Sequence, residues 1–292
     1  MKDYLVRGLV QSKNCRVFAC QTTHLLEEAR VKHGLWPTAS AALGRLMSAT
    51  LMMGAMNKNH EKMTVTINGG GPIGTLLATT NSDGKIKAFV ANPEVHYQYD
   101  NGKLAVGVAV GNEGTLQVIR DMGLKEPFVG TVPLQTGEIG EDFSYYFMVS
   151  EQVPSVVSVG VLVNDTNEIL SSGGFIIQLL PEATEDDIAY IENKMKDFPP
   201  VSSLIQEGKT SEEILKMIFD DVEILGEQDL FYECDCSKDK MKEALMTVGE
   251  NEIQAMIDED HGCEMVCQFC NEKYQFSEEE LKDLLGEMRK DN

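Results

Sequence analysis

Four cysteines near the C-terminus constrain the fold of this 292-residue chain more than any other feature. Cys234 and Cys236 stand in the run Glu-Cys-Asp-Cys, and Cys267 and Cys270 stand in Cys-Gln-Phe-Cys, with 30 residues between the two pairs. Two close pairs at such a separation are the pattern from which a chain builds a tetrahedral four-thiolate zinc site. We therefore expect these cysteines to bind one Zn²⁺ per chain. Because thiolates are also oxidised easily, the same group can report the redox state.

The residues around the second pair make the zinc prediction more specific than a bare Cys-x-x-Cys. Two thiols on a tight turn, followed by alternating aromatic residues, are typical of a zinc-ribbon knuckle. The aromatic side chains expected to cover the metal are Phe269, Tyr274 and Phe276. The first pair can reach the same ion, because neighbours at i and i+2 on an extended chain point the same way. The alternative is four buried free thiols. However, a small region with few large apolar residues needs an additional source of stability such as a bound metal ion.

Three other cysteines and one histidine are weaker candidates. Cys263 lies four residues before Cys267, and His261 is close to it, so each could be a further ligand. The spacing and aromatic context of the four-cysteine set fit together better, so we expect Cys263 to be a free thiol near the site. Cys15 and Cys20 lie in expected N-terminal strands, where cysteine is often a small buried apolar residue.

Charge is distributed very unevenly along the chain, whose formal net charge is −22. Residues 1–181 carry 16 acidic and 14 basic residues, whereas residues 182–292 carry 31 acidic and 11 basic residues, a net charge of −20. An acidic surface repels phosphate backbones, so we do not expect nucleic-acid binding. Solubility explains most of this charge, but dense like charge also weakens the compact state of the C-terminal third.

One apolar segment, residues 38–56, approaches the length of a membrane span. Its only charge is Arg45, but Ser, Thr and Gly residues dilute its hydrophobicity, and an Arg at mid-span is costly in a bilayer. We therefore expect a buried core helix and no membrane association. The N-terminal sequence has no apolar stretch typical of a signal peptide, and seven cysteines without an export signal favour a reducing compartment. We expect a cytoplasmic protein.

Hydrophobic periodicity predicts an α+β fold in three parts. Residues 1–181 are expected to form a mixed β-sheet domain covered by helices, with one large sheet or two. Residues 182–230 are expected to form a helical linker with a thin apolar stripe, since Ile188 and Ile191 follow helical spacing and a capping box begins at Thr210. Residues 231–292 are expected to form a small zinc-binding domain. The expected N-terminal strands are 4–10, 16–21, 63–68, 73–80, 85–91, 115–120, 128–132, 155–163 and 168–180.

No motif in the sequence demands catalysis. The run Gly69-x-Gly71-x-x-Gly74 matches the dinucleotide fingerprint on paper, but that fingerprint requires a helix next. Here Pro72 interrupts the run and a strand-like segment follows, so we expect a tight β-turn. A phosphate-binding loop with its Lys, a His-Glu-x-x-His motif and a Gly-x-Ser-x-Gly motif are all absent from the sequence. We expect a protein that is not an enzyme and has no catalytic residues.

Taken together, these motifs make the chain similar to a known family. The Cys-x-Cys and Cys-x-x-Cys pairs resemble those of the redox-regulated 33 kDa chaperonins, also called heat-shock protein 33. The resemblance extends to the N-terminal domain, where it rests on the runs 68–74 (Asn-Gly-Gly-Gly-Pro-Ile-Gly) and 136–142 (Thr-Gly-Glu-Ile-Gly-Glu-Asp), and on Tyr146-Phe147 and Ser150-Glu151-Gln152. It covers essentially the whole chain. Cys263 is a departure from the family pattern.

The resemblance implies a holdase chaperone. In the family, the reduced protein binds zinc through four thiolates and is inactive. The resemblance further implies that oxidants convert the pairs into the disulfides Cys234–Cys236 and Cys267–Cys270, that zinc leaves, and that the C-terminal region and the linker unfold. Exposed apolar surface then binds unfolding client proteins, and the family forms homodimers. The linker's apolar stripe and the N-terminal face that it covers are the candidate client surfaces.

Two other classes of protein remain open at the level of sequence. One is a zinc-ribbon interaction module for nucleic acid or transcription machinery, which the acidic C-terminal third disfavours. The other is a thiol–disulfide oxidoreductase that uses Cys267-x-x-Cys270. Such an enzyme needs an exposed thiol of low pKa, usually at a helix start, and the aromatic-rich knuckle does not resemble that arrangement.

Overall fold

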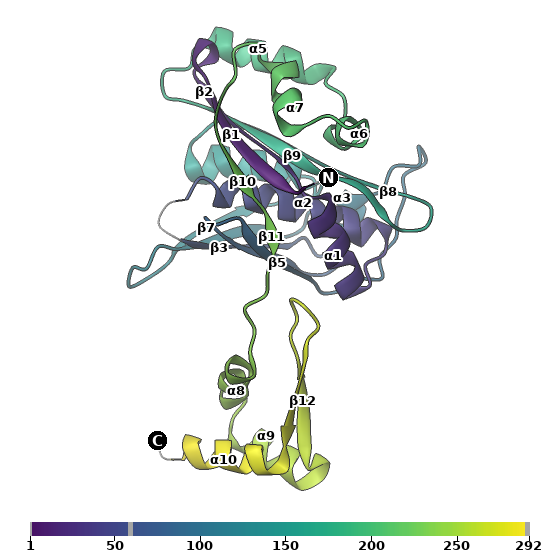
Figure 1. The fold of residues 1–292 in the computed structure, drawn as a ribbon, viewed down its shortest axis with the longest axis vertical. Coiled ribbons are helices and arrows are strands. Elements are labelled where there is room, and N and C mark those ends of the chain that lie inside the picture. The colour runs from purple at the N-terminus through teal and green to yellow at the C-terminus, as the bar shows by residue number, and fades with distance from the viewer. Residues whose placement is uncertain (1, 58–60, 290–292) are drawn as a thin grey trace. The chain divides into compact units, whose positions relative to one another are not determined.

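The chain folds into two compact units, Met1–Glu233 and Cys234–Asn292, and the computed structural model describes residues 2–57 and 61–289. Figure 1 shows the course of the chain through both units. The first unit contains two β-sheets with helices packed on them, and the second contains a β-hairpin and short helices. The predicted division into 1–181, 182–230 and 231–292 assigns functional roles to the parts, and it stays a prediction.

One sheet of the first unit has five strands in the order β10-β1-β2-β9-β8, all antiparallel to their neighbours. These strands are β1 (Tyr4–Val10), β2 (Cys15–Gln21), β8 (Ser155–Val163), β9 (Ile169–Leu179) and β10 (Glu223–Asp229). The two central strands, β2 and β9, are buried along almost their whole length. This burial indicates a sheet that is covered on both faces.

The other sheet has six strands in the order β11-β5-β4-β3-β6-β7. They are β3 (Lys62–Asn68), β4 (Leu76–Asn81), β5 (Lys85–Val90), β6 (Thr115–Asp121), β7 (Phe128–Pro133) and β11 (Phe231–Tyr232). Only the β11–β5 pair of this sheet is parallel among the described strands, so the sheet is mixed. In β3 and β5 buried residues alternate with more exposed ones, which places one face on the core.

The glycine-rich run after β3 is a turn, as predicted. The amide of Gly74 donates to the carbonyl of Gly71 at 3.0 Å, and the chain continues directly into β4. No helix follows whose N-terminus could receive a pyrophosphate. The dinucleotide fingerprint is therefore only a coincidence of spacing.

Helix α2 (Pro37–Gly54) forms the centre of the first unit and contacts strands of both sheets, between which it lies (Figure 1). All of its residues except Pro37 and Arg45 are buried. The predicted core helix is thus confirmed, and no helix within the described residues is long and apolar enough to cross a membrane. The other helical segments around this core are α1 (Thr23–His33), α3 (Val106–Val110), α4 (Gly140–Tyr146), a π-helical turn η2 (Phe147–Glu151) and a 3₁₀ turn η1 (Gln11–Lys13).

Three linker helices cover the face of the five-stranded sheet that is turned away from α2 (Figure 1). They are α5 (Glu185–Lys196), α6 (Val201–Gln206) and α7 (Ser211–Ile218). Capping boxes start α5 at Thr184 and α7 at Thr210, the second of which was predicted from sequence. The helices and the sheet share a separate hydrophobic core, whose largest members include Val6, Val17, Phe175, Ile177, Ile191, Leu204, Ile205, Ile214, Leu215 and Phe219.

The end of the predicted helical linker is not helical. After α7, Glu223–Asp229 forms strand β10 on the edge of the five-stranded sheet, and Phe231–Tyr232 forms β11 on the other sheet. The prediction was wrong here because the segment has little apolar alternation of its own. Its strand conformation depends on the hydrogen-bonding edge of β1, which is distant in sequence.

The second unit has a small core. It contains α8 (Lys238–Met246), α9 (Glu250–Ala255) with a π-helical turn η3 (Met256–Asp260), the antiparallel hairpin of β12 (Gly262–Val266) and β13 (Lys273–Ser277), and α10 (Glu278–Met288). The buried apolar residues of this core are Leu245, Ile253, Ile257, Phe276, Leu281, Leu284 and Leu285. A core of this size supplies little stability by itself, so the unit depends on another source of stability.

Candidate metal centre

The turn between β12 and β13 carries Cys267 and Cys270. The amide of Cys267 donates to the carbonyl of Glu272 at 2.9 Å, and the amide of Asn271 donates to the carbonyl of Cys267 at 2.8 Å. Asn271 has a left-handed backbone conformation with φ of 60°, which Asn tolerates better than most residues. These bonds fold the turn into a tight knuckle from which two thiols project.

The segment between β11 and α8 carries Cys234 and Cys236. Helix α8 begins immediately afterwards, where the hydroxyl of Ser237 accepts a hydrogen bond from the amide of Lys240. The ammonium group of Lys240 in turn donates to the carbonyl of Asp235 at 2.7 Å. The start of the helix therefore fixes the short segment that presents the first pair of thiols.

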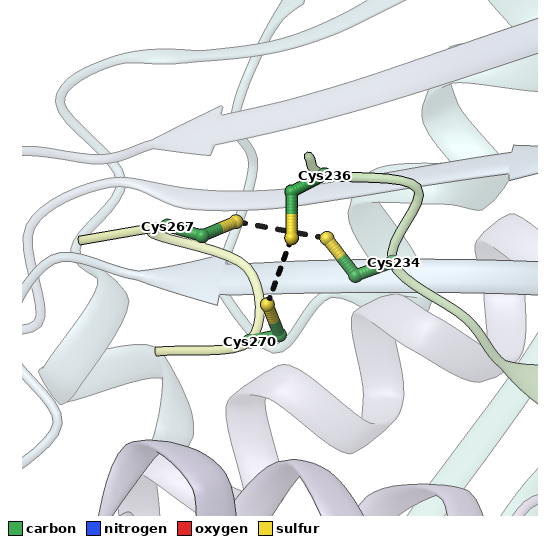
Figure 2. A group of neighbouring side chains, drawn as sticks. All are labelled: Cys234, Cys236, Cys267 and Cys270. Carbon is green, nitrogen blue, oxygen red and sulfur yellow. Dashed lines mark hydrogen bonds between the residues drawn. The ribbon is translucent and has the colours of Figure 1, made fainter. Parts of the chain in front are cut away.

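The four sulfur atoms converge on one point, as Figure 2 shows. They all lie within 4.8 Å of one another, with 3.6 Å between Sγ of Cys234 and Cys267 and 3.4 Å between Sγ of Cys236 and Cys270. A tetrahedral ion with zinc–sulfur bonds of about 2.3 Å has sulfur–sulfur edges of roughly 3.8 Å. The size and the all-sulfur chemistry of the group therefore fit a metal ion, and the four cysteines predicted to lie together do so.

The thiols differ in how readily they lose their protons. Burial and the neighbouring thiols raise the pKa of Cys234, and burial raises the pKa of Cys270 to about 11. Burial also acts to raise the pKa of Cys236, but hydrogen bonds, first that from Tyr274, outweigh it and leave this pKa below its ordinary value. Cys236 therefore carries negative charge more easily than Cys234 and Cys270, from which a metal must displace protons.

The hydroxyl of Tyr274 is a part of the site that sequence reasoning missed. The ring was expected to cover the metal, but the hydroxyl oxygen lies 3.1 Å from Sγ of Cys236 and donates to it. That hydrogen bond raises the pKa of Tyr274, which keeps the hydroxyl protonated at neutral pH. The sequence could not predict this bond. Tyr274 and Phe276 are two positions apart on a strand, so the alternation pattern assigns both side chains to the same face and does not distinguish them. Phe276 is instead buried in the core of the second unit.

The weaker candidates lie outside the group of four. Cys263 is on β12 opposite Phe276 and packs against the small core, and burial raises its pKa. His261 is exposed, with Nδ1 3.1 Å from a carboxylate oxygen of Glu278. Within residues 2–57 and 61–289, the four-cysteine group is the only set of three or more His, Cys, Asp and Glu ligand atoms close enough to hold an ion.

The two N-terminal cysteines are structural. Cys15 and Cys20 are fully buried on β2, and burial raises the pKa of each thiol to about 12. Sγ of Cys20 donates weakly to the carbonyl of Ser48 in α2. Protonated and shielded thiols of this kind are inert toward oxidants.

The fold and the site together define a protein in which a unit of two β-sheets is followed by a four-cysteine metal-binding module. The family model described as Hsp33 protein matches residues 3–277. The 33 kDa chaperonin of Bacillus subtilis is 50% identical over 284 residues, which cover 97% of this chain and 98% of that protein. The 33 kDa chaperonin of Staphylococcus carnosus is 49% identical over 290 residues, which cover 98% and 99%.

A solved structure agrees with these relatives. The crystal structure of the 33 kDa chaperonin (heat shock protein 33 homolog) from Thermotoga maritima has a TM-score of 0.91 and 36% identity, and the match covers 100% of both chains. The chain belongs to the Hsp33 family of 33 kDa chaperonins. It is therefore a redox-regulated holdase chaperone and not an enzyme, which decides against the interaction module and the oxidoreductase.

Proposed function

We propose that the reduced protein binds one zinc ion through Cys234, Cys236, Cys267 and Cys270, and that it is inactive in this state. The observation that carries the proposal is the convergence of the four sulfur atoms within 4.8 Å. Four thiolates form a soft, tetrahedral ligand set. Such a set binds zinc in preference to hard cations such as Mg²⁺ and Ca²⁺. When bound, the ion would hold the Cys-x-Cys segment against the knuckle and thereby stabilise the second unit.

Oxidation by hydrogen peroxide would convert the ligands into the disulfides Cys234–Cys236 and Cys267–Cys270. In each step two thiolates lose two electrons and form one S–S bond, while peroxide takes up these electrons and two protons and becomes two water molecules. The closest sulfur pairs in the folded site join different segments, Cys234 with Cys267 and Cys236 with Cys270. Pairing within each segment is supported by its very short loops, whose ends stay close together once the unit loses its fold.

Loss of the ion would unfold the second unit. Structural zinc supplies on the order of 10–16 kcal/mol in small zinc peptides, whereas whole domains are stable by only about 5–15 kcal/mol. The two proposed disulfides close short loops, so they restrain little of the unfolded chain. The small apolar core and the acidic composition of this region would not compensate for the lost ion.

The linker helices would then loosen and expose the apolar face of the five-stranded sheet, which we propose as a surface for client proteins. Residues of this face, such as Val17, Phe175 and Ile177, are fully buried under α5–α7. The linker helices do not cover this face completely, since a cavity of about 160 Å³ lies beside Ile177 of the sheet and Ile188 and Ile191 of α5. Unfolding proteins expose apolar segments that such a face can bind. A homodimer and a cytoplasmic location complete the proposal.

One experiment tests these steps together. Zinc-loaded, reduced protein is treated with peroxide at a mildly denaturing temperature, and zinc release, disulfide positions and aggregation of a thermally unfolding test enzyme are followed in parallel. We expect loss of the ion, the disulfides Cys234–Cys236 and Cys267–Cys270, and suppressed aggregation. Zinc release without protection of the test enzyme would contradict the proposed switch. Sedimentation of the reduced and the oxidised protein tests the dimer.

A further inference from the structure

Residues 223–233, which we call the strap, connect the edges of the two sheets of the first unit. The β10 part of the strap is the outermost strand of the five-stranded sheet, where it pairs with β1. The β11 part pairs with β5 at the edge of the six-stranded sheet. Figure 1 shows the strap passing from one sheet to the other. Cys234, the first proposed zinc ligand, follows the strap directly in the chain.

The C-terminal half of the strap is held by main-chain hydrogen bonds and by a few side chains. The amide of Phe231 donates to the carbonyl of Gly84 at 2.9 Å, and the amide of Glu233 donates to the carbonyl of Ile86 at 2.9 Å. Leu230 is the one apolar residue of the strap that is buried. The hydroxyl of Tyr232 also donates to the carbonyl of Ala88 at 3.2 Å, and Glu233 forms an exposed ion pair with Lys85. A short segment with so few buried side chains is of low local stability.

The N-terminal half of the strap is a poor strand. Its pairing with β1 shifts register between Arg7 and Gly8, which leaves Leu225 without a partner in the ladder, and Leu225 is 56% exposed. Gly226 adds no side chain to pack and lowers strand propensity. The ion pairs of Lys2 with the acidic residues of β10 are exposed and contribute little.

Strand β1, in contrast, is firmly held without the strap. It pairs over its whole length with β2, and its residues Leu5, Val6 and Val10 are buried in the cores on the two faces of the sheet. If the strap left, β1 would keep its extended form and present a row of unpaired amide and carbonyl groups. Ile224 of the strap and Val222 just before it are half-buried and pack against the linker core, so their departure with the strap would leave adjacent apolar space.

We infer that the edge of β1, once the strap has left it, binds an extended segment of an unfolded client protein by strand addition. The inference rests on the proposed function and names a mode of recognition for it. Main-chain pairing is independent of sequence, so it suits clients that share no motif, while the adjacent apolar space favours segments with alternating apolar residues. The strap is thus an internal strand that occupies the site until its connection to the metal centre is released.

Two other strand edges of the first unit, those of β7 and β8, do not depend on the strap. Within the described residues, β7 and β8 are the outer strands at the opposite ends of their sheets, and neither pairs with β10 or β11. Pairing at β7 or β8 would therefore be equally available before and after oxidation. The edge of β5 pairs with the strap through only two residues, Phe231 and Tyr232, whereas β1 pairs with six. Among these edges, only that of β1 is both long and covered by the strap in the reduced structure, so only its availability would change greatly when the strap leaves.

Synthetic peptides test for strand addition. A fluorescent peptide with the sequence of residues 220–231 is titrated with oxidised and with reduced full-length protein, and its affinity is read from anisotropy. Two further peptides carry N-methyl groups, one on residues 226 and 228 and the other on residues 227 and 229. Beyond the bulge, alternate amides of an edge strand face the sheet and the solvent, so only one of these two peptides loses hydrogen bonds to β1. All side chains are the same in the three peptides.

The expected result is binding of the unmodified peptide to the oxidised form only. One methylated peptide should bind about tenfold or more weakly, and the other should bind almost as well as the unmodified peptide. Equal affinity of both methylated peptides, or no binding of the unmodified peptide, would overturn the inference. Occupation of the edge by β10 of a second copy, seen as cross-links between β1 and β10 of different chains, would also overturn it. Aggregation assays on the same samples show separately whether the proposed holdase function holds.

A variant of the strap gives a second test in the full chain. The three atoms nearest to a Cβ atom added at Gly226 belong to the flexible guanidinium group of Arg7, the closest at 3.3 Å, so Gly226→Val can be accommodated and raises strand propensity. We expect the oxidised variant to bind the unmodified peptide several-fold more weakly, because the strap competes better, while its zinc release is unchanged. Unchanged peptide affinity in a variant with a more protected strap, as measured by hydrogen exchange, would contradict the inference.

Discussion

Tyr274 donates a hydrogen bond from its hydroxyl group to Sγ of Cys236 over 3.1 Å, and this bond connects the β12–β13 hairpin to the Cys-x-Cys segment. Tyr274 lies on β13, whereas Cys236 lies just before α8. The bond thus joins the two halves of the metal centre independently of an ion. A hydrogen bond to a thiolate also withdraws electron density from the sulfur, so it lowers the reactivity of Cys236 toward peroxide.

The variant Tyr274→Phe should retain the aromatic ring and lose only this bond. We expect zinc affinity to fall by about tenfold, as is usual when a partner of a metal ligand is removed, and peroxide to release zinc faster. Competition with a chromophoric chelator measures the first effect, and stopped-flow zinc release measures the second. Tyr97→Phe, in the first unit, is the matched control and should change neither. A slower release of zinc from Tyr274→Phe would show that the hydroxyl does not protect Cys236.

The ligand set can be tested with two cysteine substitutions that are close in sequence. Cys270→Ser removes one proposed ligand and should abolish tight zinc binding and unfold the second unit, because the small core cannot hold the unit alone. Cys263→Ser should retain one zinc ion per chain, since Cys263 is on β12 and packs against the core. Metal analysis and near-ultraviolet circular dichroism measure both outcomes. Loss of zinc from Cys263→Ser would show that the ligand set is wrong.

Elements with strong local signals were predicted well from the sequence. The expected strand at 4–10 is β1, and the apolar segment after Pro37 is the central helix α2. Strand β10 was missed because its conformation comes from the partner strand rather than from its own residues. The sequence also left open whether there was one sheet or two, because register and sheet membership depend on contacts between distant segments.

The metal centre was predicted as a set of residues but not as a structure. Spacing and aromatic context selected Cys234, Cys236, Cys267 and Cys270 over Cys263, and the four sulfurs do converge. The hydrogen bond between the hairpin and the Cys-x-Cys segment could not be predicted, because it depends on how two segments that are 38 positions apart meet in space. The disulfide pairing stays a prediction, since all four sulfurs are close together in the folded site.

The ion pair between Arg45 of the central helix α2 and Glu138 predicts that the stability of the first unit depends on pH. Glu138 accepts hydrogen bonds from Arg45 at 2.5 Å and from Tyr99 at 2.9 Å. Partial burial acts to raise the pKa of Glu138, but the bond and charge of Arg45 outweigh it, so the pKa lies below its ordinary value in the folded state. The carboxylate therefore stabilises the fold above the unfolded-state pKa of about 4.3, and this contribution is lost as pH falls through the lower folded-state pKa.

We accordingly expect Glu138→Gln to lower the free energy of unfolding of the first unit by about 1–3 kcal/mol at pH 7. The difference from the parent protein should shrink below about pH 4.5 and disappear once Glu138 is protonated in the folded protein. Urea denaturation at a series of pH values measures it. Glu141→Gln, an exposed substitution three residues further along the chain at the start of helix α4, is the control and should have little effect. A destabilisation that stayed constant down to pH 3 would mean that the ion pair is not its cause.

The packing of the linker helices against the five-stranded sheet should determine the peroxide concentration at which the chaperone becomes active. Ile214 on α7 is 2% exposed and lies in the core shared with the sheet, whereas Met217 on the same helix is 40% exposed. Ile214→Ala should weaken this packing by about 2–5 kcal/mol, and Met217→Ala should cost little. We expect Ile214→Ala to suppress client aggregation at lower peroxide concentrations than the parent protein, with the zinc site intact. An unchanged peroxide dependence, despite faster proteolysis of the linker, would show that release of the second unit and not linker packing limits activation.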